Sequence, residues 1–560
     1  MSKHEAFRRA AVPQQVAQQL QTITIPAPTR GIIQNENEAY MQPGGAVVCD
    51  NWKPTMKGVS LRGGFNRWCV LPDEVPIVSG FQYASGNNQR MFAGQATKLY
   101  DVTTNTPTLI KSGQTSGNYV AAQLANQGGD WMIVVNDAGN APLRFDGATW
   151  VTLNASQIDV DLVKYPGARV DGGANLVYVC KYRNRLFFIE LNSMNAWYLG
   201  LNSVGGNLEM IPLSGAATKG GKLLFCASWS IDAGDGIDDK LVFCTDLGEL
   251  LIFTGSNPAD PANWRQEGRY QMSPPLGMNA HLAVGGDLLI ATVDGIMPTS
   301  GAITKDRAEL ELAAITRQIK PMWREEAIDK REHPWTMCKW DEYGGIFTTV
   351  PGDLPGKQKC LVVNAATGAW TRFTGWDCMC FLRMRGDMFF GTQKGIVMQA
   401  DRTGTDDGKP YVAVLVGGWE MFQSPSQTVT WRQSRASFSA RAGEPFQPQL
   451  SATTDYVVTL PTPPPAGPDP GVLDLWDAGL WGPPGSGTPN PPPPADVATY
   501  AQWDTGVPPK PVVRNTGWVS IGLTGYSHAP VVQVTVAQAA KPEVDLISIA
   551  ATFERAGVNV

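Results

Sequence analysis

Between residues 90 and 401 the chain repeats one pattern seven times: an apolar run, a tight turn built on Asp, Asn, Gln or Gly, and a second apolar run. Val, Ile, Leu and Phe suit a half-buried pleated sheet, and a turn such as Asp294-Gly295 allows the positive φ with which two strands fold back. Each copy therefore predicts a β-hairpin. The hairpins start near Arg90, Trp131, Arg185, Lys240, Asp287, Cys360 and Asp387.

The spacing of these hairpins indicates the fold. Most starts lie roughly 40 to 55 residues apart, which is the size of a four-stranded propeller blade. The last two, at Cys360 and Asp387, are closer together, and we interpret them as two halves of one blade. The pattern predicts a mainly β protein with an irregular β-propeller of about six blades.

One segment has a helical pattern instead. Residues 303–320 carry apolar side chains on one helical stripe, and Pro321 follows, so we expect an inserted helix that ends there. The stripe either packs on its own propeller or contacts a neighbouring subunit, and the sequence leaves both open. The candidate residues for an oligomer interface are Leu312, Ile315, Ile319 and Trp323.

The chain divides into three predicted parts. Residues 1–30 are Gln-rich and are expected to form an arm that orders only against a neighbour. Residues 31–410 form the propeller platform, and residues 411–560 a C-terminal β-rich extension. Within the extension, residues 461–511 hold 16 of the 42 prolines, which predicts a loop because proline cannot donate a hydrogen bond within a sheet.

Composition limits the classes of function. Charged residues make up 17% of the chain and the net charge is −6, so no broad basic face is available to bind nucleic acid tightly. The longest apolar runs are strand-sized, so we expect no membrane span. Most of the nine Cys lie within apolar strand sequences and are expected to be buried thiols, which fits assembly in a cytosol.

Candidate chemistry is sparse. We find no Asp box, nucleophile elbow, phosphate-binding loop or zinc-protease motif, and therefore predict no catalytic residue and no cofactor. The four His are scattered, so no zinc site is expected. One acidic loop offers hard oxygen ligands for calcium, although a solvated turn is the interpretation we favour. Its carboxylates are Asp232, Asp235, Asp238 and Asp239.

Several stretches together resemble the tail nozzle, or tubular tail, proteins of short-tailed bacteriophages, a group that includes packaged-DNA stabilisation proteins. The resemblance covers nearly the whole chain, although residues 483–495 depart from the pattern as an insertion. It is carried by Gly31-Ile32-Ile33, Met41 to Ala46, Asn51-Trp52-Lys53-Pro54, Gly58 to Gly64, Leu99-Tyr100-Asp101, Asp294 to Pro298, the Trp-Asp turns at Trp476 and Trp503, and the closing strands at 517–525 and 545–553.

The resemblance implies a homohexamer around a channel for double-stranded DNA, located in the virion tail and assembled in the host cytoplasm. Its implied partners are the head-to-tail adaptor above and tail fibre or tip proteins. A lumen without excess cations suits this role, because Lys and Arg contacts to phosphate would retain DNA in transit. We therefore expect a structural protein, not an enzyme, that closes the channel after packaging and conducts DNA during ejection.

Two other classes of function stay open. A propeller can host a hydrolase that acts on bacterial surface glycan. In that case, the replacement of one essential carboxylate residue would abolish glycan turnover. It can also bind a host receptor sugar through exposed rings, for which Trp476 and Trp503 are the candidates.

Overall fold

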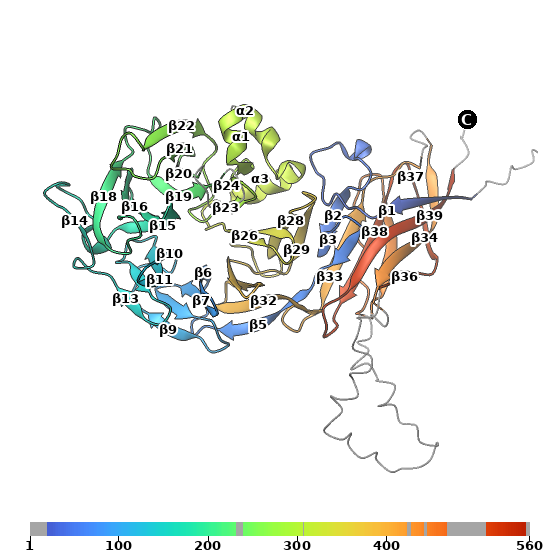
Figure 1. Cartoon of the computed structure of the whole chain (residues 1–560). Helices are drawn as coiled ribbons and strands as arrows, with labels where there is room; N and C mark the ends of the chain where they lie inside the picture. The colour runs from blue at the N-terminus through green and yellow to red at the C-terminus, as the bar shows by residue number, and fades with distance from the viewer. Residues whose placement is uncertain are drawn as a thin grey trace, which may run out of the picture.

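The computed structural model describes residues 20–230, 239–305, 307–422, 427–441, 445–466 and 511–555. The chain forms a ring of small β-sheets and, beside it, a second β region built of longer strands (Figure 1). The predicted mainly β propeller is confirmed. No helix within the described ranges is both long and apolar enough to cross a bilayer.

Six sheets belong to the propeller alone, in agreement with the predicted six blades. The first two are β6 (Ile77–Ser85), β7 (Asn88–Gln95), β8 (Lys98–Asp101), β9 (Thr108–Lys111), and β10 (Tyr119–Asn126), β11 (Gly129–Asn136), β12 (Leu143–Phe145), β13 (Trp150–Thr152). The third is β14 (Ile158–Val160), β15 (Leu176–Tyr182), β16 (Arg185–Glu190), β17 (Asn195–Tyr198), β18 (Gly206–Pro212), with the short η2 (Asp171–Gly173) before β15.

The remaining three complete the set. They are β19 (Leu223–Trp229), β20 (Lys240–Thr245), β21 (Glu249–Thr254), β22 (Arg265–Gln271); then β23 (His281–Val284), β24 (Asp287–Thr292), β25 (Gly295–Pro298); and last β30 (Cys380–Met384), β31 (Asp387–Gly391), β32 (Ile396–Thr403), β5 (Gly64–Val70). In the last sheet β5, from early in the chain, pairs antiparallel with β32. Strands more than 300 residues apart in sequence therefore close the ring.

Four further strands are shared between the ring and the second β region. They are β26 (Met337–Trp340), β27 (Gly345–Thr349), β28 (Lys359–Asn364) and β29 (Trp370–Thr374). They continue into β2 (Ala46–Asp50), β33 (Tyr411–Gly417), β38 (His528–Val536) and β35 (Pro448–Thr454) as one eight-stranded sheet. One sheet thus runs from the propeller into the second region.

All seven predicted hairpins are present as consecutive antiparallel strands. The last two lie in different sheets, β28–β29 and β31–β32, so our interpretation of them as halves of one blade is wrong. The pair β31–β32 is the middle of a four-stranded blade, and β28–β29 belongs to the eight-stranded sheet. The six-blade count stands because the hairpin at Cys360 belongs to the shared sheet.

The second β region is a sandwich. Opposite β2-β33-β38-β35 lies a seven-stranded sheet of β1 (Gln21–Pro26), β3 (Trp52–Pro54), β4 (Val59–Leu61), β39 (Val544–Arg555), β34 (Val429–Ala440), β36 (Val512–Asn515) and β37 (Val519–Gly525). Alternate residues of both sheets meet in a core that includes Phe438, Leu546 and Val532. The same core continues through Trp323, Trp335 and Trp370 beside the propeller.

The predicted division of the chain is therefore wrong at its N-terminal side. Residues 21–26 are ordered within their own chain, because β1 pairs antiparallel with β39. Strands β2, β3 and β4, placed in the platform by the sequence, also belong to the second region, whereas η1 (Glu38–Tyr40) lies between β1 and β2. Residues 1–19 and 467–510 of the predicted arm and Pro-rich loop lie outside the described residues.

The predicted helix over 303–320 is broken into short pieces. These are α1 (Thr299–Thr304), α2 (Arg307–Leu310), η3 (Glu311–Ala313) and η4 (Arg317–Ile319), and they precede α3 (Lys320–Asp329). Ala314 is extended, with ψ of 130°, and ends the helical run. Pro321 lies in the first turn of α3, the longest helix among the described residues, instead of ending a helix, because a missing N–H costs nothing in a first helical turn.

Candidate functional site

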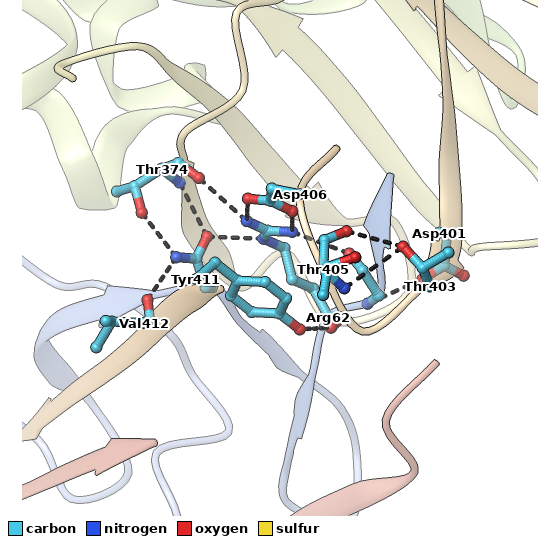
Figure 2. Close-up of polar contacts among 10 residues, drawn as sticks. Arg62, Thr374, Asp401, Thr403, Thr405, Asp406, Tyr411 and Val412 are labelled. Carbon is cyan, nitrogen blue, oxygen red and sulfur yellow. Dashed lines mark hydrogen bonds and ion pairs between the residues drawn. The ribbon is translucent and has the colours of Figure 1, made fainter. Parts of the chain in front are cut away.

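A buried arginine joins the propeller to the second β region. Arg62 follows β4, and its side chain is 1% exposed. Its guanidinium makes two hydrogen bonds to the carboxylate of Asp406, from Nη1 to Oδ1 at 2.8 Å and from Nη2 to Oδ2 at 2.6 Å (Figure 2). Nε donates to Asn51 Oδ1, Nη1 to Gly63 O and Nη2 to Thr374 O, at 2.8, 3.0 and 3.1 Å. All five N–H donors of the guanidinium are therefore used.

The residues around Arg62 come from four separate parts of the chain. Asn51 donates to Thr374 Oγ1 and to Val412 O, both at 2.7 Å, and accepts from Thr374 N at 2.9 Å. Tyr411 donates from its hydroxyl to Arg62 O, and its ring lies 4.0 Å from the guanidinium carbon. The turn between β2 and β3, the end of β29, the loop after β32 and the start of β33 are thereby held around Arg62 (Figure 2).

Two glycines allow this close approach. A Cβ at Gly63 would lie 2.2 Å from Asp401 Oδ1, and one at Gly64 would lie 2.0 Å from the backbone oxygen of Thr405. Asp401 instead accepts a hydrogen bond from Gly63 N at 3.0 Å and pairs with Lys541 of the second region. The Arg62-Gly63-Gly64 sequence is needed because only glycine fits between these backbones.

The electrostatics keep this site ionised and closed. Burial acts to lower the pKa of Arg62, but the adjacent Asp406 carboxylate outweighs it, so the pKa is raised. Burial is also the main cause that raises the pKa of Tyr411 above its ordinary value. The guanidinium of Arg62 is thus fully paired and the hydroxyl of Tyr411 is hydrogen-bonded. The arrangement therefore suits a fixed joint better than proton transfer. A groove of about 510 Å³ beside it reaches Asp406.

The second candidate site is a cavity of about 310 Å³ at the centre of the propeller. Strands β6, β10, β15, β26 and β30 contribute to its lining, together with His281 of β23. Arg383 is the one charged residue among those that line it, and no Asp or Glu is among them. A propeller glycosidase would require carboxylates at such a position.

His281 is the one titratable ring in this lining apart from the tyrosines. It stacks on Phe225 with 4.2 Å between ring centroids, and its Nε2 lies 3.1 Å from the Tyr178 hydroxyl. Burial lowers the pKa of His281 to about 4. The ring is therefore neutral at neutral pH and packs in the cavity wall against Phe225 and Tyr178.

The predicted interface residues do not lie together on a surface. Trp323 is fully buried, donates from Nε1 to Thr292 O at 2.9 Å and packs against Trp335. Ile319 is also fully buried, and Ile315 packs against the same core. Only Leu312, which is 58% exposed, is free for a neighbour, so the assignment of this stripe to an oligomer interface is wrong for Ile319 and Trp323.

Of the calcium candidates, Asp232, Asp235 and Asp238 lie outside the described residues. Asp239 is buried, and its backbone oxygen accepts hydrogen bonds from the Tyr182 hydroxyl and from Arg183. Within the described ranges, no three His, Cys, Asp or Glu side chains are grouped to hold a metal ion. Trp476 and Trp503 also lie outside the described residues.

In the sequence, Arg62-Gly63-Gly64 stands out only as part of the stretch from Gly58 to Gly64, and its partner Asp406, 344 positions away, was not predicted. An arginine followed by two glycines was the available signal, since it combines a bidentate donor with backbone that others can approach closely. Nothing local in the sequence indicates which carboxylate accepts.

No family model and no curated protein matches this chain. Solved structures do. The extracellular domain of a hybrid two-component system from B. thetaiotaomicron is 10% identical with a TM-score of 0.38, over 61% of this chain and 40% of that one, so the match spans less than half of that protein. The Cps50 (Swd1) β-propeller domain of Myceliophteria thermophila is 11% identical with a TM-score of 0.37, over 60% and 99%. Likenesses this weak carry no functional argument, and the propeller assignment rests on strand topology.

Proposed function

We propose that this chain is a structural protein of a short-tailed phage virion, forming a homohexameric ring in the tail that closes the DNA channel after packaging and conducts DNA during ejection. The observation that carries the proposal is the continuity between the two parts of the chain. One eight-stranded sheet and one hydrophobic core run from the propeller into the sandwich. A rigid joint of this kind suits a tube that must hold packaged DNA.

The Arg62 cluster supports the same interpretation. It fixes the propeller and the sandwich through a buried, fully hydrogen-bonded charge pair, which resists relative movement of the two parts. The sequence resemblance to tail nozzle proteins supplies the class of assembly. Partners of this ring would be the adaptor above it and tail fibre or tip proteins, with DNA in transit but not tightly bound.

One observation weighs against a glycan hydrolase, and another agrees with the proposal. The cavity on the propeller axis has no carboxylate among its described lining residues, so it lacks the pair that glycan hydrolysis uses. A net charge of −6 with few charged residues also fits a channel that must release DNA.

The test is the particle itself. A phage that lacks this protein should package DNA but lose it, which nuclease sensitivity of the DNA in purified particles measures, and tagged protein should be located at the tail by electron microscopy. The proposal is abandoned if the protein is absent from particles, or if particles without it retain nuclease-resistant DNA. Monomers in solution alone would not decide the matter, since such a ring can close on a preformed adaptor.

A further inference from the structure

Four charged side chains gather at the C-terminal end of α3. Lys330 caps this helix, and its Nζ contacts the carboxylates of both Glu326 and Asp353. Lys359 of β28 places its Nζ 2.6 Å from Glu326 Oε1 and 3.7 Å from Asp353 Oδ2. Two cations therefore face two carboxylates, and each carboxylate lies against both cations.

The pair formed by Lys330 and Asp353 is removed from water. Their side chains are 8% and 7% exposed, and among the ion pairs that join two described residues this is the one with both partners less than a tenth exposed. The fully buried rings of Trp323 and Trp335 pack against each other at the same end of the helix. Desolvation of two charges is costly, so a reaction that removes both of them is favoured in this position.

The backbones of the two residues are held in place. Trp335 donates from Nε1 to Lys330 O at 3.0 Å, and Gln393 donates from Nε2 to Asp353 O at 2.9 Å. An amine that contacts a carboxylate oxygen lies about 3–3.5 Å from the carboxyl carbon, which is the distance at which the two atoms react. The Lys330 nitrogen is therefore positioned as a nucleophile for Asp353.

The cluster starts in its ionised form. Burial acts to lower the pKa of Lys330, but Asp353 and Glu326 outweigh it, so the pKa is raised. Burial acts to raise the pKa of Glu326, but Lys330 and Lys359 outweigh it, so that pKa is lowered. Transfer of one proton within a buried pair gives a neutral amine and a neutral carboxylic acid, which are the reactive forms. Because this form is the minor one, the reaction should be slow.

We propose that Lys330 and Asp353 condense into an intramolecular isopeptide bond, with Glu326 carrying protons between them. The bond from Lys330 Nζ to Asp353 Cγ forms, and the bond from Cγ to Oδ1 breaks. Of the three ammonium protons, two leave with Oδ1 as water and one stays on the amide nitrogen, so atoms and charge balance without an oxidant. Glu326 contacts Nζ and accepts a proton there for delivery to Oδ1. Lys359 faces Oδ2, where negative charge develops in the tetrahedral intermediate.

The product leaves no unpaired charge in the cluster. The charges of Lys330 and Asp353 disappear together, and Lys359 and Glu326 remain as one ion pair. The new bond ties the end of α3 to the loop after β27, across the hairpin of β26 and β27. Such a cross-link restricts the unfolded chain as a disulfide does. The inference needs only one folded chain, so it does not depend on the proposed phage role.

Mass spectrometry of the denatured wild type tests the bond. Protein that has been kept folded for several days should be lighter than its sequence by one water molecule. After digestion with trypsin, residues 325–331 should be joined to residues 340–357, because the amide blocks cleavage after Lys330. A chain that keeps the full mass of its sequence would overturn the inference. A water lost at any other place, such as a succinimide at an Asp-Gly pair, would overturn it too.

One variant tests the proton carrier. Glu326→Gln keeps both bonded residues and should lose water about a hundredfold more slowly than the wild type. Glu311→Gln is the matched control, because Glu311 also contacts a lysine, Lys320, but both side chains are more than a third exposed apart from a marginal 35% for Glu311. This control should lose water at the wild-type rate. Equal rates for the two variants, each shown to be folded by circular dichroism, would refute the role of Glu326. Should Glu326→Gln not fold, the mass of the wild type still decides whether the bond exists.

Discussion

Replacement of Arg62 by Met should be the most costly single substitution at the joint between the two parts of the protein. Met fills a similar volume but leaves the Asp406 carboxylate without its partner and removes one donor each from Asn51 Oδ1, Gly63 O and Thr374 O. Breaking a buried charge pair in this way costs about 3–5 kcal/mol. Because the side chain of Asp406 is 12% exposed and borders a groove of about 510 Å³, water can reach it, so we expect the lower end, about 3 kcal/mol.

The assay is urea unfolding followed by tryptophan fluorescence and circular dichroism. With a slope of about 3 kcal/mol per molar urea, the midpoint should fall by about 1 M. Arg67→Met is the matched control. Arg67 pairs with Asp407 at 2.6 Å, but these side chains are 50% and 28% exposed, so its loss should cost below about 1 kcal/mol. Arg62→Lys keeps the charge without the planar fork and should fall between the two. If Arg62→Met shifts the midpoint no more than Arg67→Met does, our account of the joint is wrong.

Three further outcomes are expected. Trp323→Ala should cost about 3–5 kcal/mol of stability, because the Trp323 ring is buried. Leu312→Ala should change the unfolding midpoint little, because the Leu312 side chain is exposed. Equal effects of the two substitutions would contradict the placement of these residues. The pKa of His281 is depressed to about 4, so the unfolded chain binds its proton more readily, and stability should be lost as pH falls from about 6.5 to 4. His281→Gln should remove about 2–3 kcal/mol of this loss at pH 4.5. Burial raises the pKa of the Cys338 thiol to about 11 and the pKa of the fully buried thiols further. A thiol reagent at pH 8 should therefore label the native protein slowly, and all nine cysteines should react only in denaturant. Rapid labelling of the native protein would contradict the burial of these thiols.

Local pattern was enough to predict the hairpins, because alternating apolar side chains and turn residues determine a strand pair within about 15 residues. It could not determine which sheets the hairpins join. The spacing of Cys360 and Asp387 suggested one blade, yet the connection between them passes from the shared sheet to the last blade. Likewise nothing near Gln21 indicates that its partner is Phe553.

The same limit applies to the helix and to the candidate site. The stripe from Leu312 to Ile319 has helical spacing, but tertiary packing holds Ala314 extended and draws Ile319 into the core. Arg62 lies in a stretch that carries the sequence resemblance, but its role depends on Asp406, which lies 344 positions along the chain. Long-range partners of this kind follow from the whole fold and not from any window of sequence.

The pairing of β1 with β39 has a consequence for how the protein is made. Roughly 500 residues must be synthesised after β1 leaves the ribosome before its partner strand exists, which takes on the order of 25–100 s at about 5–20 residues per second. Until then the uncharged β1 has no partner, and β5 likewise waits for β32. The ring can therefore close only after β32 has been translated, and the sandwich only after β39 at the end of the chain, so that a product cut short between these two strands cannot finish the sandwich.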